Sequence, residues 1–191
     1  MKKITWLLLS LIVFTANAQV ILLQENFQDW TPEQGIAPVP PSKSPGGVEY
    51  SITKKLYDGK TEGIFKSNAL IVSPAQSIGE PGRAEGNDKP TPGRVAIKGA
   101  KNYLELPKLQ SIGQVKIKAN AGTDLKEFKL QAATNGYFED IPETVTACPK
   151  AVTKLYTYNL KFATPTTLRI VPLSGSSIYI WDLEISSYSN K

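Results

Sequence analysis

Apolar and polar residues alternate along much of the chain. Every second residue is apolar in residues 114–119 (QVKIKA) and 127–132 (EFKLQA), and residues 153–162 and 167–171 follow the same rhythm. Because successive side chains of a β-strand point to opposite faces, this pattern predicts strands with one buried and one solvated face. We find no stretch with the i, i+3, i+4, i+7 apolar spacing of an amphipathic helix.

The same alternation marks the end of the chain. Residues 177–187 predict a final strand in which Tyr179, Trp181, Leu183 and Ile185 share one face. Four large apolar side chains on one face indicate the buried side of a sheet. We therefore expect Trp181 to pack in the core.

Glycine and proline, 14 of each, interrupt these segments at short intervals. Residues 31–48 and 73–94 are especially rich in Pro, Gly and Ser, and they are predicted to be long loops. Short strands separated by turns predict an all-β fold, an antiparallel two-sheet β-sandwich. Neither loop separates two stretches that are each long enough to fold alone, so residues 19–191 are interpreted as a single domain.

The first residues have the pattern of a signal peptide. Lys2 and Lys3 precede an apolar run at residues 6–14, and small residues at Ala16 and Ala18 follow it. This order predicts cleavage after residue 18 and a secreted or periplasmic mature protein. No later segment is apolar enough to predict a membrane span.

Composition excludes several function classes. The formal charge of +5 is small and the lysines are scattered along the strands, so no nucleic-acid partner is expected. The chain contains no histidine, which removes the commonest general base and the usual catalytic triads. The single cysteine, Cys148, is interpreted as a small buried or loop residue. We expect no enzymatic activity.

Three segments carry a family resemblance. They are residues 25–30 (ENFQDW), residues 93–122, which contain YLELP and VKIKA, and residues 166–186, which contain LRI and IYIWDLEI. Together they resemble the galactose-binding-like jelly-roll β-sandwich domains of exported Bacteroidetes-type proteins, which are often attached to polysaccharide-degrading enzymes. In one departure from that family, Trp181 stands where an acidic residue is usual.

The resemblance implies that the first and last strands lie side by side. Glu25 and Asp182 would then be the ligands of a structural Ca²⁺, because calcium prefers oxygen ligands. Such an ion would hold the two ends of the domain together and would take no part in chemistry. The alternative is that both are exposed charges at a strand edge.

The candidate sugar contacts lie in a turn-rich segment, TNGYFED, at residues 134–140. Tyr137 and Phe138 are expected at a loop tip, with Asn135 and Glu139 beside them to hydrogen-bond hydroxyl groups. In the alternative, the two aromatic rings fold back onto the rim of the sandwich.

The function that the resemblance implies is that of an exported, non-catalytic carbohydrate-binding module with a polysaccharide or glycan as partner. The alternative from a different class is a structural or adhesive domain that contacts another protein of the cell envelope.

Overall fold

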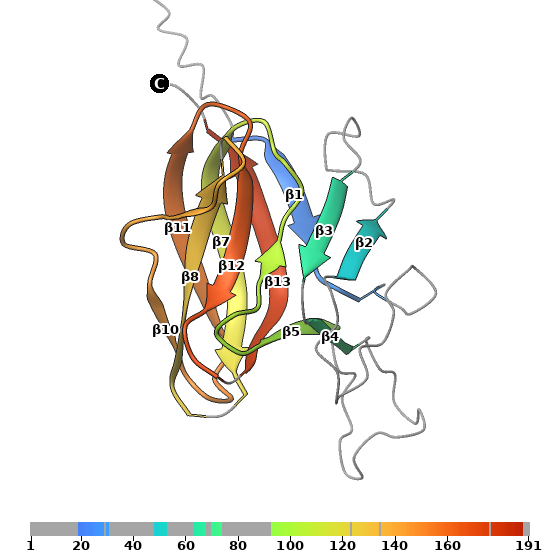
Figure 1. Ribbon diagram of the computed structural model, residues 1–191, viewed down its shortest axis with the longest axis vertical. Helices are drawn as coiled ribbons and strands as arrows, with labels where there is room; N and C mark the ends of the chain where they lie inside the picture. Colours follow the sequence, from blue (N-terminus) through green and yellow to red (C-terminus); the bar gives the residue numbers. More distant parts are fainter. Residues whose placement is uncertain are drawn as a thin grey trace, which may run out of the picture.

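The protein is an antiparallel β-sandwich of two sheets (Figure 1). This computed structural model describes residues 19–28, 30, 48–52, 63–67, 70–73, 93–122, 124–133, 135–175 and 177–188. Within these residues all ladders between named strands are antiparallel, and there is no helix. No helix in that part of the chain is therefore long enough to cross a membrane. The predicted all-β two-sheet sandwich is confirmed.

The first sheet has the strand order β11-β7-β13-β5-β4, and β1 pairs with β13 beside β5. The chain crosses repeatedly between the two sheets. As a result, β7 and β13 lie in the first sheet while β8 and β12 lie in the second (Figure 1). The first sheet contains β1 (Ile21–Glu25), β4 (Leu70–Ser73), β5 (Arg94–Lys98), β7 (Ile112–Ala121), β11 (Lys154–Phe162) and β13 (Ser177–Ser187).

The second sheet has the order β10-β8-β12-β6-β3-β2, and β9 pairs with the end of β8. It contains β2 (Val48–Ile52), β3 (Gly63–Ser67), β6 (Leu104–Glu105), β8 (Lys126–Ala133), β9 (Glu139–Asp140), β10 (Thr146–Cys148) and β12 (Thr167–Pro172).

The core lies between the inner faces of the two sheets. In β7 the residues Val115, Ile117 and Ala119 are fully buried, and in β8 so are Phe128 and Leu130. These are the apolar positions of the two alternating segments, so the predicted faces are confirmed. The polar positions between them remain on the outer faces of the sandwich, where ligands have access.

The last strand has the predicted bounds, and Leu183 and Ile185 of its predicted face are buried, but Tyr179 and Trp181 are only half-buried, so the predicted core position of Trp181 is wrong. The pairing of β13 with β7 shifts register between Ile180 and Asp182, which makes Trp181 the extra residue of a β-bulge. Ile180 and Leu183 both face the core, whereas Trp181 turns outward and is only half-buried. The bulge lies where the pairing of β13 with β5 ends and its pairing with β1 begins.

The sandwich is closed along one side by β10 and β11. Cys148 is buried there, and burial raises the pKa of its thiol. The rings of Tyr156 and Tyr158 pack edge-on against Phe128, and the Tyr158 hydroxyl donates to Thr146 Oγ1 at 2.7 Å. Of the two positions predicted for Cys148, buried or in a loop, the structure shows the buried one.

The two predicted loops and the signal peptide fall almost wholly outside the described residues. Residues 1–18, 31–47 and 74–92 are not among them, and β2, β4 and β5 begin or end next to these stretches.

Candidate functional site

The tip between β8 and β9 exposes one of the two predicted aromatic rings. Gln131 pairs with Asp140, and Gly136 turns the chain with a φ of 90°, a conformation that L-residues rarely adopt. The Tyr137 side chain, next in sequence, is 84% exposed. The local turn chemistry therefore holds a tyrosine ring out into solvent.

Phe138 instead turns back onto the outer face of the second sheet. The Arg169 guanidinium carbon lies 3.6 Å from the centroid of the Phe138 ring and 3.9 Å from that of Tyr103. A guanidinium attracts the faces of aromatic rings, so it can hold both rings in place. Tyr137 is therefore exposed at the loop tip, as expected. Phe138 instead folds back onto the sandwich, as in the alternative.

A carboxylate fixes the arginine in turn. Arg169 and Glu105 pair across β12 and β6, and Glu105 Oε2 accepts a hydrogen bond from Arg169 Nε at 2.9 Å and forms an ion pair with Nη2 at 2.7 Å. Both side chains are largely buried, with 24% and 14% exposed. We call Tyr103, Glu105, Phe138 and Arg169 the Arg169 platform.

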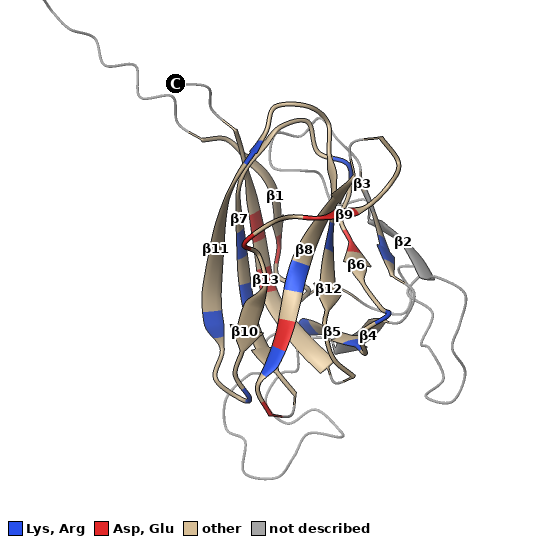
Figure 2. Ribbon diagram, turned by 60° about the vertical axis from the view of Figure 1, so that its left-hand side comes forward, with Lys and Arg blue, Asp and Glu red and all other residues tan. Residues whose placement is uncertain are grey.

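A row of polar side chains crosses the second sheet at the level of this platform. Strand register places each member opposite the next, so that donors and acceptors alternate across five strands. In Figure 2, acidic positions of β6 and β9 and basic positions of β8 lie on this side of the sandwich. The row consists of Lys66, Glu105, Arg169, Gln131 and Asp140.

The acidic end of the row is held by two neighbours. Lys129 Nζ donates to Asp140 Oδ2 at 2.6 Å, and Gln131 Nε2 donates to Oδ1 at 2.9 Å. The hydrogen bond from Lys129, followed by that from Gln131, lowers the pKa of Asp140 below its usual value. This carboxylate is therefore an ionised acceptor at neutral pH.

The four predicted contact residues do not converge on one point. Asn135 and Tyr137 are exposed at the tip, and Phe138 lies on the outer face. Glu139 pairs with Ala132, which packs against the core, so alternation directs Glu139 to the other face of the sheet edge.

Sequence reasoning missed Arg169, Tyr103 and Glu105. The only local signal is that Arg169 occupies a polar position between the buried Leu168 and Ile170. The contact between Arg169 and Glu105 joins residues 64 positions apart. No spacing within the sequence indicates it.

The predicted pairing of the first and last strands is confirmed, since β1 pairs with β13 and Glu25 lies opposite Leu183. Glu25 is 1% exposed, so it is not an exposed edge charge, and its Oε1 accepts a hydrogen bond from the backbone N–H of Phe27 at 2.8 Å. Asp182 is half-buried and lines a hollow on the outer face of the sheet.

The two candidate calcium ligands are therefore neighbours along the β1–β13 ladder, but Glu25 lies opposite the core-facing Leu183 whereas Asp182 lies on the outer face. Burial is the main factor that raises the pKa of Asp182, and the nearby Glu25 contributes in the same direction. Among the described residues no group of three or more His, Cys, Asp or Glu side chains could hold a metal ion. Side chains alone therefore supply two carboxylates here, and a calcium ion would need backbone oxygens as well.

Comparison with known proteins finds similar folds among solved structures. No protein-family model and no curated protein matches the chain. The family-22 xylan-binding domain of Xyn10C from Paenibacillus barcinonensis shares 10% identity, with 91% of this chain and 99% of that domain covered at a TM-score of 0.46.

Two other solved structures have a similar fold. A cleaved adhesin domain of Lys-gingipain from Porphyromonas gingivalis shares 17% identity over 87% of this chain and 98% of the domain, at a TM-score of 0.43. A Clostridium thermocellum xylanase complexed with xylohexaose shares 15% identity over 66% of this chain, at a TM-score of 0.43. The chain spans only 26% of that two-module protein.

The folds that resemble this one thus include carbohydrate-binding modules and adhesin domains. Because these identities are all below 20% and the TM-scores are all below 0.5, the function has to be argued from the side chains of this chain.

Proposed function

We propose that the protein is an exported, non-catalytic carbohydrate-binding module that holds a glycan on the outer face of its second sheet. The observation that carries the proposal is the Arg169 platform beside the exposed ring of Tyr137. A pyranose ring packs its C–H face on aromatic side chains, while charged and amide groups hydrogen-bond its hydroxyls. The polar row across the second sheet supplies such groups next to the rings.

Fixed geometry favours binding at this site. The Phe138 and Tyr103 rings are held against one guanidinium, which Glu105 holds in turn, so less side-chain freedom is lost when a ligand arrives. A few stacked rings and solvent-exposed hydrogen bonds give a modest affinity, with a Kd of about 1 mM to tens of μM.

The carboxylates of this face are better suited to hydrogen bonding than to catalysis. Glycoside hydrolysis needs one carboxylic acid that keeps its proton near neutral pH. Hydrogen bonds from Lys129 and Gln131 lower the pKa of Asp140, and Glu105 forms an ion pair with Arg169. The chain also has no histidine. These features support a binding role.

The proposal includes the location and the structural ion. Residues 1–18 act as a signal peptide, so the mature domain begins at Gln19 outside the cytoplasm. A Ca²⁺ held by Glu25 and Asp182 together with backbone oxygens would stabilise the junction of β1 and β13. Calcium should then raise the melting temperature and Asp182→Asn should remove the rise. If the melting temperature is the same in calcium and in a chelator, the proposed calcium site is ruled out.

The test of the binding function is a glycan array on the mature domain, followed by titration of the best ligand. The Tyr137→Ala, Phe138→Ala double variant should melt a few degrees below the wild type, because one cation–π contact of Arg169 is lost, and should lose most of its binding. Val152→Ala, at a 54% exposed position between β10 and β11, is the matched control and should bind the ligand normally.

Full binding by the double variant would move the site away from the β8–β9 tip. If no glycan on the array binds the wild-type domain, the glycan-binding proposal fails. The structural or adhesive role, with a protein of the cell envelope as partner, would then be the better description.

A further inference from the structure

The outer face of the first sheet carries a second arrangement of arginine and aromatic rings. The Arg94 guanidinium carbon lies 4.4 Å from the centroid of the Tyr179 ring and 5.0 Å from that of Trp181. Arg94 begins β5, and both aromatic residues belong to the adjacent strand β13. This group is on the opposite side of the sandwich from the Arg169 platform.

Three neighbouring features fix the two rings. The β-bulge of β13 turns Trp181 outward, and its Nε1 donates to Asn120 Oδ1 at 2.5 Å. The Tyr179 ring rests against Gly122, where an added Cβ would come within 2.8 Å of ring carbon Cε2. A larger residue at Gly122 would displace the ring, so the glycine makes this surface possible.

Arg94 differs from Arg169 in the hydrogen-bond acceptors available to its guanidinium. Arg169 is stacked on two rings and its guanidinium donates to the Glu105 carboxylate. Arg94 is stacked on two rings in a similar way, but no residue that the structure describes accepts a hydrogen bond from it or forms an ion pair with it. A guanidinium held flat against rings keeps its donor edge free for a planar anion.

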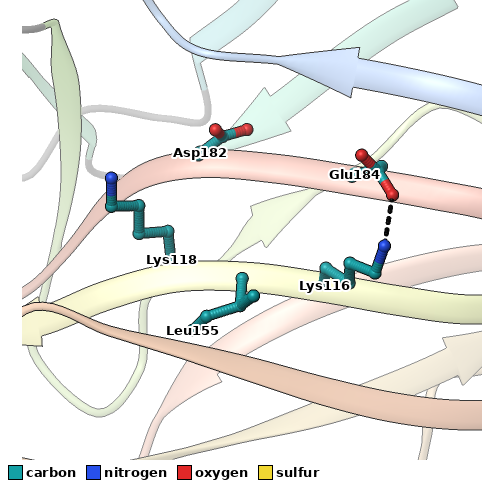
Figure 3. Close-up of a pocket in the computed structure, with 5 residues that line it drawn as sticks. All are labelled: Lys116, Lys118, Leu155, Asp182 and Glu184. Carbon is teal, nitrogen blue, oxygen red and sulfur yellow. Dashed lines mark hydrogen bonds and ion pairs between the residues drawn. The ribbon is translucent and has the colours of Figure 1, made fainter.

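A hollow of about 350 Å³ lies on the same face, and Asp182, the residue after Trp181, is part of its lining. Figure 3 shows its lining, in which Lys116 and Glu184 form an ion pair of 2.8 Å while Lys118 lies near Asp182. Leu155 adds an exposed apolar side chain. Asp182 follows Trp181 directly in β13, so the lining of the hollow begins one residue from the aromatic pair. The hollow therefore offers hydroxyl-binding groups and an apolar contact next to a preset guanidinium.

We propose that this face is a second glycan site, and that it binds an acidic oligosaccharide through a uronate carboxylate on Arg94, with a neighbouring sugar unit in the hollow. The carboxylate takes the place that Glu105 has on Arg169. Lys118 hydrogen-bonds the hydroxyls of the neighbouring unit, and Leu155 contacts its apolar face. The ligand class rests on the proposed glycan-binding function, but the site itself is independent of the Arg169 platform.

The experiment titrates the mature domain with a short oligogalacturonate and with the same oligosaccharide after its carboxyl groups have been reduced to alcohols. Calorimetry gives the affinity, and the fluorescence of Trp181 reports occupation of this face. Trp181→Phe should abolish the fluorescence change. The uronate form should bind and the reduced form should bind at least about tenfold more weakly, since a charge-assisted bidentate contact is lost.

Variants of Arg94 locate the anion. Arg94→Gln should weaken oligogalacturonate binding about tenfold, and Arg94→Lys should recover only part of the loss because an ammonium lacks the planar fork. The matched control is Lys98→Gln, which removes the same charge from an exposed position of the same strand and should change the affinity less than about twofold. Arg94→Lys keeps the charge and tests the proposal if Arg94→Gln fails to fold.

Three results would overturn the proposal: equal losses in Arg94→Gln and Lys98→Gln, equal binding of the reduced oligosaccharide, or binding of a sulfated oligocarrageenan when oligogalacturonate fails. The last would assign the anion as a sulfate ester. The Tyr137→Ala, Phe138→Ala variant separates the two sites, because it should retain oligogalacturonate binding while it loses the ligand of the second sheet.

Discussion

Arg169→Met should lower both the stability of the domain and its affinity for a glycan. The substitution keeps a long apolar side chain but removes the charge that lies between the Phe138 and Tyr103 rings. Two cation–π contacts at partly exposed sites are worth about 0.5–1 kcal/mol each. The hydrogen-bonded ion pair with Glu105, which is largely buried, adds about 1 kcal/mol.

These contributions sum to a free-energy loss of about 2–3 kcal/mol, which corresponds to a melting temperature lower by about 5–10 °C for a domain of this size. Thermal unfolding followed by circular dichroism measures the change. The control is Lys129→Met, which removes a 2.6 Å ion pair on the same face without any ring contact. Asp140 is 57% exposed, so solvent screens this pair and it contributes about 0–1 kcal/mol, and the control should melt close to the wild type.

The partner variant separates the two contributions. Arg169→Met leaves the Glu105 carboxylate largely buried without its arginine, so adding Glu105→Gln should recover part of the lost stability. Titration of a glycan that the wild type binds should show a large loss of affinity in Arg169→Met and a smaller loss in Lys129→Met, which leaves the rings of the platform in place. Equal melting temperatures of Arg169→Met and Lys129→Met, or equal affinities, would refute the role given to the Arg169 platform.

Three further outcomes follow from the fold. Trp30 is 1% exposed, so Trp30→Ala should lower the free energy of unfolding by about 3–5 kcal/mol. Trp181 is only half-buried, so Trp181→Ala should lower it by about 1–2 kcal/mol. Chemical denaturation measures both, and equal costs would contradict the outward position of Trp181. Burial raises the pKa of Tyr158 to about 12, above the unfolded value near 10. The contribution of this shift to the free energy of unfolding is therefore complete below about pH 10, and it is lost as the pH rises through about 12. Melting temperatures between pH 8 and pH 12 should therefore fall less steeply in Tyr158→Phe, and parallel curves would exclude this linkage. Gly113→Ala would place a Cβ 2.3 Å from the Ser187 carbonyl oxygen and should destabilise the domain by about 1–3 kcal/mol, which a normal melting temperature would disprove.

The sequence by itself determined the class of fold and the buried faces of its long strands. Alternation of apolar and polar residues depends only on the pleat of a single strand, so it identified the buried positions of β7 and β8 without knowledge of their partners. The turn at Gly136 is also local, which is why the exposure of Tyr137 could be anticipated. The bounds of β13 followed from the same kind of signal.

Only the tertiary structure decided which side chains meet. Strict alternation of faces placed Trp181 in the core, because the extra residue of a β-bulge cannot be recognised in the sequence. The bulge lies where β13 changes its partner from β5 to β1. The Arg169 platform brings together residues of β6, β12 and the β8–β9 tip, and the Arg94 group depends on the pairing of β5 with β13. Such contacts depend on register between strands that are distant in sequence, and register is fixed by the packing of the whole sandwich.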